Sequence, residues 1–291
     1  HYGQSLFEGM KAFRHQSGKI ALFRPKENYQ RMVKGAEAVC LEAPPEELFL
    51  TAIKELIRVD KRWVPHAENC SLYIRPFLFG SEAFLGVRPS NMYTFMIILS
   101  PVGNYYAEGE KPIKIWIEDH FVRATPGGLG DVKAGANYAA SLRASVKAKE
   151  KGYAQVLWLD ANHRYIEEVG TMNIFFVFKD EIITPSLDGS ILAGITRDTV
   201  IDLLLQQSLP VKDRKIGIEE ILDRIQKKEL IEAFGTGTAA VISPIGSFRY
   251  KNKEYPISST VGDLSSSLKS KICKIQRGHF PAPHGWVELI D

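Results

Sequence analysis

A lysine in a glycine-rich stretch, Lys133, is the best candidate of this sequence for covalent bonding to a carbonyl compound. It lies between Gly130 and Gly135, just ahead of a predicted helix. Residues 125–133 fit neither a phosphate loop nor G-x-G-x-x-G, because Lys133 stands where the last glycine should be. An amine must lose its proton before it forms a Schiff base, and a desolvated, tightly turned site favours that loss. Lys133 is therefore a candidate Schiff-base lysine, with a solvated loop lysine as the alternative.

Two neighbouring acids, Glu167 and Glu168, precede an apolar run that begins at Asn173. They could mark only the edge of a strand, but a buried carboxylate needs a cationic partner. The protonated ring nitrogen of pyridoxal 5'-phosphate (PLP) is such a partner, and an acid there tunes the cofactor's electronics. Two small-residue segments, 194–196 and 234–240, could bind a phosphate through backbone N–H groups. A lysine, an acid and two such segments are more specific together than alone.

Helices and strands are predicted in mixed order around these residues. Pro25 opens a helix that reaches Cys40, and a helix from Tyr138 is stopped by Gly152. Thr196 is predicted to cap a helix that ends near residue 207. Further helices are predicted at 49–57, 218–225 and 265–275, strands at 72–79, 92–99, 113–117, 155–160, 173–179 and 182–184, and a hairpin at 248–255. This order favours an α+β or mixed α/β fold over a parallel doubly wound sheet.

The composition argues against several classes of protein. Thirty-seven Lys and Arg against 34 Asp and Glu leave a net charge of +3, without the basic excess of an electrostatic nucleic-acid binder. Hydrophobic residues at 45% and charged residues at 24% exclude a disordered chain. Three distant cysteines and seven scattered histidines favour a reducing compartment and no metal site. The apolar runs are too short to span a membrane.

The chain length suggests about two domains. A run rich in Gly, Tyr and charge, 101–112, is the predicted connection. We expect a small domain over 1–105, a connection over 106–112 and a large domain over 113–291. The sequence starts at His1 and not at a methionine, and Leu6-Phe7 already resembles the middle of a secondary-structure element. We therefore expect an N-terminal piece, and any targeting signal, to be missing. The predicted location is the cytoplasm, with the mitochondrion left open.

In a series of blocks the sequence resembles the branched-chain amino acid aminotransferases, PLP enzymes of fold type IV. The similar blocks follow one another along nearly the whole chain: 6–13, 22–25, 72–76, 85–87, 100–103, 130–138, 155–159, 168–173, 194–197 and 234–239. The resemblance implies two domains with PLP at their interface, and a homodimer. It also implies reversible transfer of the amino group of L-leucine, L-isoleucine or L-valine to 2-oxoglutarate.

Two alternatives stay open beside this interpretation. A fold type IV relative, either a D-amino acid aminotransferase or an aminodeoxychorismate lyase, is opposed by the blocks 73–76 and 169–173. A catalytically inactive binding module is opposed by the joint presence of Lys133, Glu168 and Tyr138. No nucleic-acid, membrane or metal partner is predicted.

The resemblance also implies roles for single residues. Lys133 would form the Schiff base and move the proton, Glu168 would bind the ring nitrogen and Tyr138 the ring hydroxyl. The phosphate would be bound by Arg31, Ile195, Thr196 and Thr238, with Asn173 supporting the cofactor site from behind. The substrate would be bound by the backbone of Thr171 and Ala239 and by a side-chain pocket of Tyr2, Phe7, Tyr73, Arg75 and Tyr105, while Leu85 and Val87 would reach the pocket of the other subunit.

Tyr73 and Arg75 lie two residues apart, so on a strand their side chains point to the same face. Arg75 would then pair with the distal carboxylate of glutamate, beside the hydroxyl of Tyr73. The alternative is a structural arginine that pins the domain interface.

Overall fold

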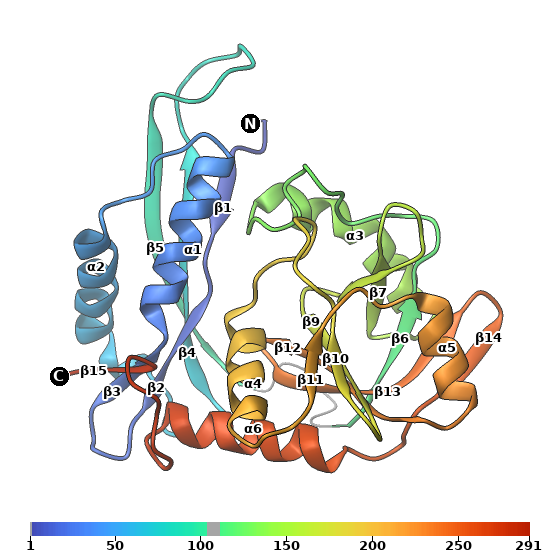
Figure 1. Cartoon of the computed structure of the whole chain (residues 1–291). Helices are drawn as coiled ribbons and strands as arrows, with labels where there is room; N and C mark the ends of the chain where they lie inside the picture. Colours follow the sequence, from blue (N-terminus) through green and yellow to red (C-terminus); the bar gives the residue numbers. More distant parts are fainter. Residues whose placement is uncertain (1, 104–110) are drawn as a thin grey trace. The chain divides into compact units, whose positions relative to one another are not determined.

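The computed structural model describes residues 2–103 and 111–291, and its contacts divide the chain into two compact units (Figure 1). Unit 1 contains His1–Tyr105, Val132–Ala136 and Ser270–Asp291. Unit 2 contains Tyr106–Asp131 and Asn137–Lys269. The contacts therefore group the later segments Val132–Ala136 and Ser270–Asp291 with the first hundred residues. The boundaries expected from the sequence placed both segments in the large domain, 113–291.

Unit 1 is built on a six-stranded sheet with the order β1-β4-β2-β3-β15, in which β5 pairs with β4. The strands are β1 (Ser5–Phe7), β2 (Met10–Arg14), β3 (Ile20–Phe23), β4 (Ser71–Gly80), β5 (Tyr93–Val102) and β15 (Val287–Ile290). The pairings between these strands are antiparallel. Strands distant in the sequence thus share one sheet, and β15 extends it at β3.

One face of this sheet is covered by α1 (Pro25–Ala38) and α2 (Glu46–Val59), followed by the 3-10 turn Lys61–Trp63. Both helices carry apolar side chains at three- and four-residue spacing, and these form a buried core with the sheet. Side chains alternate between the two faces of a strand. On β4, Leu72, Ile74 and Leu78 enter this core, so Tyr73 and Arg75 belong to the opposite face.

Unit 2 is built on a nine-stranded sheet with the order β11-β10-β9-β12-β13-β6-β7-β8, in which β14 pairs with β13. Its strands are β6 (Ile113–Ile117), β7 (Gln155–Leu159), β8 (Ile166–Val169), β9 (Asn173–Phe178), β10 (Ile182–Thr184), β11 (Val211–Asp213), β12 (Leu230–Gly237), β13 (Val241–Tyr250) and β14 (Lys253–Pro256). Parallel and antiparallel pairings both occur. This sheet confirms the predicted mixed α/β class.

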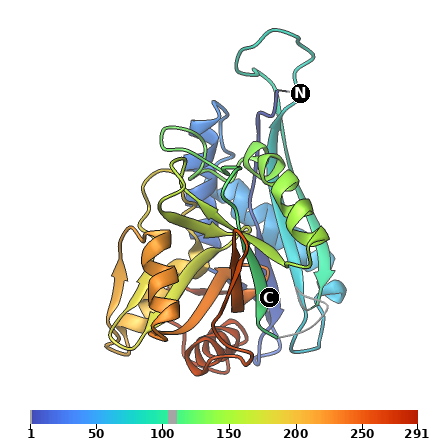
Figure 2. The ribbon, with the colours of Figure 1, turned by 90° about the vertical axis from the view of Figure 1, so that its right-hand side faces the viewer.

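Helices α3 (Gly135–Glu150) and α5 (Ile218–Gln226) cover opposite faces of the sheet of unit 2. Val156 and Trp158 of β7 pack with alanines of α3, whereas Leu157 and Leu159 face the core that includes α5. Figure 2 shows α3 in light green and α5 in orange on the two sides of the strands. Helix α4 (Ile195–Leu205) also packs on β12, and α6 (Asp263–Gln276) passes from unit 2 into unit 1 at Ser270.

Three predicted element boundaries are wrong. The cap of α4 is Gly194, whose extended backbone precedes the helix, so Thr196 lies inside the first turn. The segment 234–240 is a turn only over its last three residues, because Phe234–Gly237 pair with β13 and close β12. Helix α3 begins at Gly135, three residues before Tyr138.

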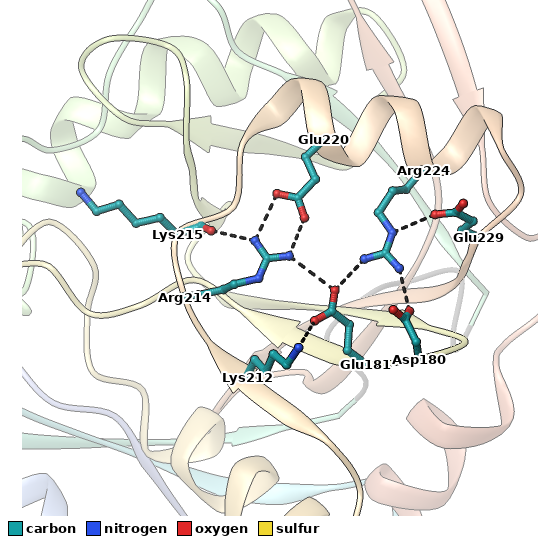
Figure 3. Close-up of polar contacts among 8 residues, drawn as sticks. All are labelled: Asp180, Glu181, Lys212, Arg214, Lys215, Glu220, Arg224 and Glu229. Carbon is teal, nitrogen blue, oxygen red and sulfur yellow. Dashed lines mark hydrogen bonds and ion pairs between the residues drawn. The ribbon is translucent and has the colours of Figure 1, made fainter.

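A network of ion pairs joins β10, β11 and α5 in unit 2 (Figure 3). Glu181 accepts hydrogen bonds from Lys212 at 2.9 Å and Arg224 at 2.7 Å, and Arg214 pairs with Glu220. Burial opposes the ionisation of Glu181, but the bonds from Lys212 and Arg224 keep the pKa of its carboxyl below its ordinary value. This network connects the edge strand β11 and the turn before β10 with α5.

Candidate active site

Lys133 is tied to β1 through its backbone. The N–H of Phe7 donates to the carbonyl oxygen of Lys133 at 3.2 Å, and Leu6 forms an isolated bridge with Ala134. The Nζ of Lys133 lies 4.7 Å from the centre of the Phe7 ring. The main chain of β1 therefore fixes the segment of Lys133, and an aromatic face lies against its amine.

The Phe7 ring also contacts Arg75, which brings three predicted substrate residues together. The guanidinium carbon of Arg75 lies 4.4 Å from the Phe7 ring centre, and its Nη2 donates to the hydroxyl of Tyr73 at 3.0 Å. A Cβ at Gly9 would overlap that hydroxyl, so a glycine is required there. The Nε of Arg75 is buried and has no hydrogen-bond partner among the described residues. A buried N–H without a partner is costly, and an acceptor on a ligand would satisfy it.

Tyr2, Leu85 and Val87 lie at a different part of unit 1. The hydroxyl of Tyr2 donates to the carbonyl oxygen of Leu85 at 2.7 Å, and Tyr2 and Val87 line a cavity of about 440 Å³. The side chains of Leu85 and Val87 are 84% and 85% exposed. The predicted pocket residue Tyr105 lies outside the described residues.

The loop that carries Leu85 and Val87 is held by an ion pair at its base. Arg88 donates two hydrogen bonds to Glu82, at 2.8 and 3.0 Å, and the N–H of Asn91 donates to the same carboxylate. These bonds lower the pKa of Glu82 to about 2. The loop thus has internal support near neutral pH.

Arg31, on α1, is paired with a buried carboxylate that was not singled out from the sequence. Its Nε and Nη2 donate to the two oxygens of Glu8, at 2.8 and 2.9 Å. Glu8 also accepts from the side chain of Asn28 at 2.7 Å. Burial opposes the ionisation of Glu8, but the charge of Arg31, its hydrogen bonds and the charge of Lys133 hold the pKa of Glu8 below its ordinary value.

Glu168 is a buried residue of β8 whose carboxylate faces cationic and N–H partners. Its Oε1 accepts from the backbone N–H of Leu192 at 2.8 Å and lies 3.5 Å from Nη2 of Arg123. Arg123 also donates to the carbonyl oxygens of Gly130 and Ser190. Arg123 was not singled out from the sequence. It connects the predicted acid with the glycine-rich segment that precedes Lys133.

Glu167 is buried on the same strand but has different partners. The hydroxyl oxygen of Ser190 lies 2.5 Å from Glu167 and 2.6 Å from Asp188. A hydroxyl has one proton, so it can donate to only one of the two carboxyl groups. Burial raises the pKa of Glu167 to about 7, whereas bonds from Ser190 hold the pKa of Asp188 below its ordinary value despite its partial burial. A protonated Glu167 that donates from Oε1 to Ser190 leaves the Ser190 hydroxyl able to donate to Asp188, while Oε2 of Glu167 is buried and has no partner among the described residues.

Asn173, Thr236 and the start of α4 meet at one end of the sheet of unit 2. Asn173 pairs with Thr236 in the β9–β12 register, and its side chain donates to the carbonyl oxygen of Leu192 at 2.9 Å. A Cβ at Gly194 would overlap the Oδ1 of Asn173, so a larger residue at the cap of α4 would displace the Asn173 side chain. A glycine cannot cap the first N–H groups of the helix, which include those of Ile195 and Thr196.

Two turns lie at the same end. Thr171 lies in the turn from β8 to β9, and Thr238 and Ala239 lie in the turn from β12 to β13. A Cβ at Gly235 or Gly237 would press on Met172, so the strand end of β12 packs against the first turn. Unit 2 therefore brings together Glu168, Thr171, Asn173, Ile195, Thr196, Thr238 and Ala239. Tyr138 lies in the first turn of α3 and is half-buried.

The groups of unit 2 fit PLP. The uncapped start of α4 and a neighbouring turn offer backbone N–H groups to a phosphate. The hydroxyl of Thr236 is buried and has no hydrogen-bond partner among the described residues, as expected of a group that awaits a polar ligand. Glu168 is a buried acid of the kind that a pyridinium nitrogen requires. Among residues 2–103 and 111–291, no three side chains are arranged to hold a metal ion, and no helix there is long and apolar enough to cross a membrane.

Two residues that contact predicted site residues, Glu8 in unit 1 and Arg123 in unit 2, were missed from the sequence. Glu8 stands between Phe7 and Gly9, and an acid beside apolar residues is a weak signal of a buried, paired charge. Arg123 has no such local signal, because its partners come from three separate segments.

Comparison with known proteins gives concordant matches. Residues 5–248 match the family model of amino-transferase class IV. The chain is 49% identical over 292 residues to the branched-chain-amino-acid aminotransferase 2 of Bacillus subtilis, covering 100% of this chain and 80% of that protein. The crystal structure of the Escherichia coli branched-chain amino acid aminotransferase matches with a TM-score of 0.85 at 28% identity, over 100% and 91% of the two chains. A branched-chain amino acid aminotransferase from the organism abbreviated T.th., solved with N-(5'-phosphopyridoxyl)-L-glutamate, matches with a TM-score of 0.83 at 28% identity, over 100% and 90%.

Proposed function

This chain belongs to the class IV aminotransferase family, and on that premise we propose that it is a PLP-dependent branched-chain amino acid transaminase. It transfers the amino group of L-leucine, L-isoleucine or L-valine to 2-oxoglutarate, reversibly. Relatives that are named branched-chain-amino-acid aminotransferases and are about half identical over the whole chain support this activity.

The observation that carries the proposal is the cluster of Lys133, Phe7, Tyr73 and Arg75. One pocket must accept an aliphatic side chain and, in the other half-reaction, the side chain of glutamate with its distal carboxylate. The Phe7 ring offers an apolar wall beside the amine of Lys133. Arg75, with a buried and unpartnered Nε, and the hydroxyl of Tyr73 offer a cation and a donor. The solved complex of the T.th. enzyme with a phosphopyridoxyl-glutamate supports glutamate as the second donor.

When bound, PLP supplies an electron sink for the bond that breaks at the substrate Cα. The side chains of this chain hold and orient it. Glu168 supplies the negative charge for the ring nitrogen, and Arg123 keeps that carboxylate in place. Tyr138 binds the ring hydroxyl. The start of α4 at Ile195 and Thr196 binds the phosphate.

The remaining groups bind the phosphate and the substrate and move the proton. Arg31 and Thr238 would also bind the phosphate, and Asn173 would support the segment before α4 through its hydrogen bond to Leu192. The N–H groups of Thr171 and Ala239, at the two adjoining turns, bind the substrate carboxylate. Lys133 would hold the cofactor through its side-chain amine and, as the general acid and base, would move the proton at the substrate Cα.

The two fold type IV alternatives have less support. A D-amino acid aminotransferase or an aminodeoxychorismate lyase would need relatives of that kind at similar identity, whereas the relatives compared are named for branched-chain substrates. An inactive binding module would have no need for a buried Arg123–Glu168 pair beside a lysine segment.

We further propose a homodimer in the cytoplasm. The exposed Leu85 and Val87, on a loop with its own ion pair, support a contact with a second copy. The relatives compared come from bacteria, which have no mitochondria, so the cytoplasm is retained and the mitochondrion is not.

Amino-donor profiling of the purified holoenzyme with 2-oxoglutarate tests this function. We expect leucine, isoleucine and valine to be the best donors and glutamate to be the product. A preference for D-alanine, or release of pyruvate from aminodeoxychorismate without amino transfer, would overturn it.

A further inference from the structure

We propose that Glu8 is a positioning residue of the phosphate site, which holds the guanidinium of Arg31 in a fixed orientation before the cofactor binds. This inference rests on the proposed function, because it takes Arg31 as a phosphate ligand. Glu8 itself touches neither substrate nor cofactor in this proposal and acts through Arg31.

The contact between Glu8 and Arg31 fixes an orientation and not only a distance. Two hydrogen bonds, from Nε at 2.8 Å and Nη2 at 2.9 Å, join one edge of the guanidinium to both carboxylate oxygens. Such a two-point contact sets the plane of the guanidinium. It uses two of the five N–H donors of an arginine.

Glu8 is itself firmly held. It is fully buried, at 0% exposure, and accepts from the side chain of Asn28 at 2.7 Å and from the N–H of Gly9 at 3.2 Å. Asn28 and Arg31 are three residues apart on α1, so they lie on the same side of that helix. One carboxylate from the β1–β2 segment therefore binds two neighbouring side chains of α1.

The ionised state of Glu8 suits this task. The charges of Arg31 and Lys133 and the hydrogen bonds outweigh burial and keep the pKa of Glu8 below its ordinary value. Without the Glu8 carboxylate, the largely buried guanidinium of Arg31 would lose a charged partner, and losing one member of a buried pair is costly. Glu8 thus allows a pre-oriented arginine to exist before the phosphate arrives.

The alternative is a purely structural role, in which the Glu8–Arg31 pair only joins α1 to the sheet. The two roles differ in their dependence on the phosphate group of the ligand. A positioning role through Arg31 affects binding of PLP but not of pyridoxal, which has the same aldehyde and ring and no phosphate. A purely structural role affects both ligands alike.

The experiment measures dissociation constants of PLP and of pyridoxal for the cofactor-free full chain and its Glu8→Gln variant, by quenching of tryptophan fluorescence. Loss of charge-assisted hydrogen bonds predicts a PLP dissociation constant about tenfold higher or more, with that of pyridoxal within about twofold. Equal weakening of both ligands, or no change in either, would overturn the inference.

Three further variants separate the possible failures. Arg31→Met should raise the dissociation constant of PLP but not that of pyridoxal. If it does not, the proposed phosphate role of Arg31 fails. If Arg31→Met has this selective effect and Glu8→Gln does not, only the role of Glu8 is rejected. Adding Glu8→Gln to the Arg31→Met variant should change the dissociation constant of PLP little further, because Glu8 acts through Arg31. Glu27→Gln, which breaks the Arg24–Glu27 pair at the start of the same helix, is the matched control and should leave both constants unchanged.

A fourth variant covers poor folding of Glu8→Gln. Asn28→Ala removes one of the bonds that hold Glu8 and keeps the ion pair itself. It should shift the ratio of the two constants in the same direction by a smaller factor. An unchanged ratio in Asn28→Ala, with Glu8→Gln unfolded, would count against the positioning role.

Discussion

At the scale of the residue, Lys133 has two tasks that no neighbouring lysine can share. We predict that Lys133→Ala abolishes turnover while the melting temperature changes little, because one amine must both bond to the cofactor and move the proton. Loss of acid–base catalysis alone costs about 10²–10⁴-fold. The matched control is Lys149→Ala, an exposed lysine of α3, which should retain activity. Peptide mapping after borohydride reduction of the holoenzyme is the direct measurement, and a label on another lysine would refute the assignment.

Glu167 and Glu168 form an internal test of the acid on the ring nitrogen. We predict that Glu168→Gln retains PLP but slows turnover by roughly 10- to 150-fold, because a neutral amide loses a charge-assisted bond to the pyridinium. Glu167→Gln should have little effect near pH 7, because Glu167 with a pKa of about 7 is about half neutral there and an amide resembles the neutral form. Steady-state rates of the two variants show which of the two acids serves the ring nitrogen. Greater damage from Glu167→Gln would mean that the other acid faces the cofactor.

Arg75 tests how one pocket accepts two kinds of side chain. We predict that Arg75→Met weakens the glutamate half-reaction by about 10- to 150-fold in kcat/KM and the leucine half-reaction far less. The reason is that only glutamate presents a distal carboxylate to the guanidinium. Single-turnover kinetics of each half-reaction provide the measurement. Equal losses in both would identify Arg75 as a structural arginine.

At the scale of the element, the sequence predicted those segments whose apolar spacing is determined locally. Helices α1, α2 and α5 each bury one stripe, and that stripe is visible in the sequence. Strand β12 was missed, and its Gly-Thr-Gly end was predicted as a turn, because that end has the composition of a turn and is kept extended by pairing with β13. Strand β15 was missed as well, because its pairing with β3 depends on residues far away in the chain.

The candidate site was predictable to a similar extent. Some candidates stand in motifs of a few consecutive residues, which a sequence shows directly. These are Lys133, Glu168 and the segments at the start of α4 and the end of β12. Glu8 and Arg123 could not be assigned, because each becomes meaningful only through partners from distant segments.

The loop that carries Leu85 tests the proposed dimer. We predict that Leu85→Asp raises the dissociation constant of the dimer at least about tenfold, because a charge would replace an apolar side chain in the contact. Sedimentation velocity over a range of protein concentrations measures it. Val59→Asp is the control, because Val59 is also an exposed apolar residue of unit 1, at the end of α2. An unchanged dimer in Leu85→Asp, or a monomeric parent protein, would contradict the proposal.

At the scale of the whole molecule, Glu167 makes the stability depend on pH. Its pKa rises from 4.5 to about 7 on folding, so the folded state holds a proton that the unfolded state releases between these values. The contribution of Glu167 is therefore complete below about pH 4.5 and is lost as the pH rises through 7. We compare the unfolding free energy of Glu167→Gln with that of the parent protein at each pH. We predict that the difference between them shifts in favour of Glu167→Gln by about 1–3 kcal/mol from pH 5 to pH 8. Urea unfolding at several pH values measures it, and a constant difference would refute the raised pKa.

The pairing of β15 with β3 has a consequence for the growing chain on the ribosome. Val287–Ile290 complete the sheet edge at Ile20–Phe23, yet they are synthesised after every strand of unit 2. Domains usually fold in the order of synthesis, at about 5–20 residues per second. Here β3 is synthesised long before its partner β15, and until β15 arrives the edge of β3 offers unpaired N–H and C=O groups to other chains. The unpaired β3 is therefore a segment that a chaperone would protect during translation.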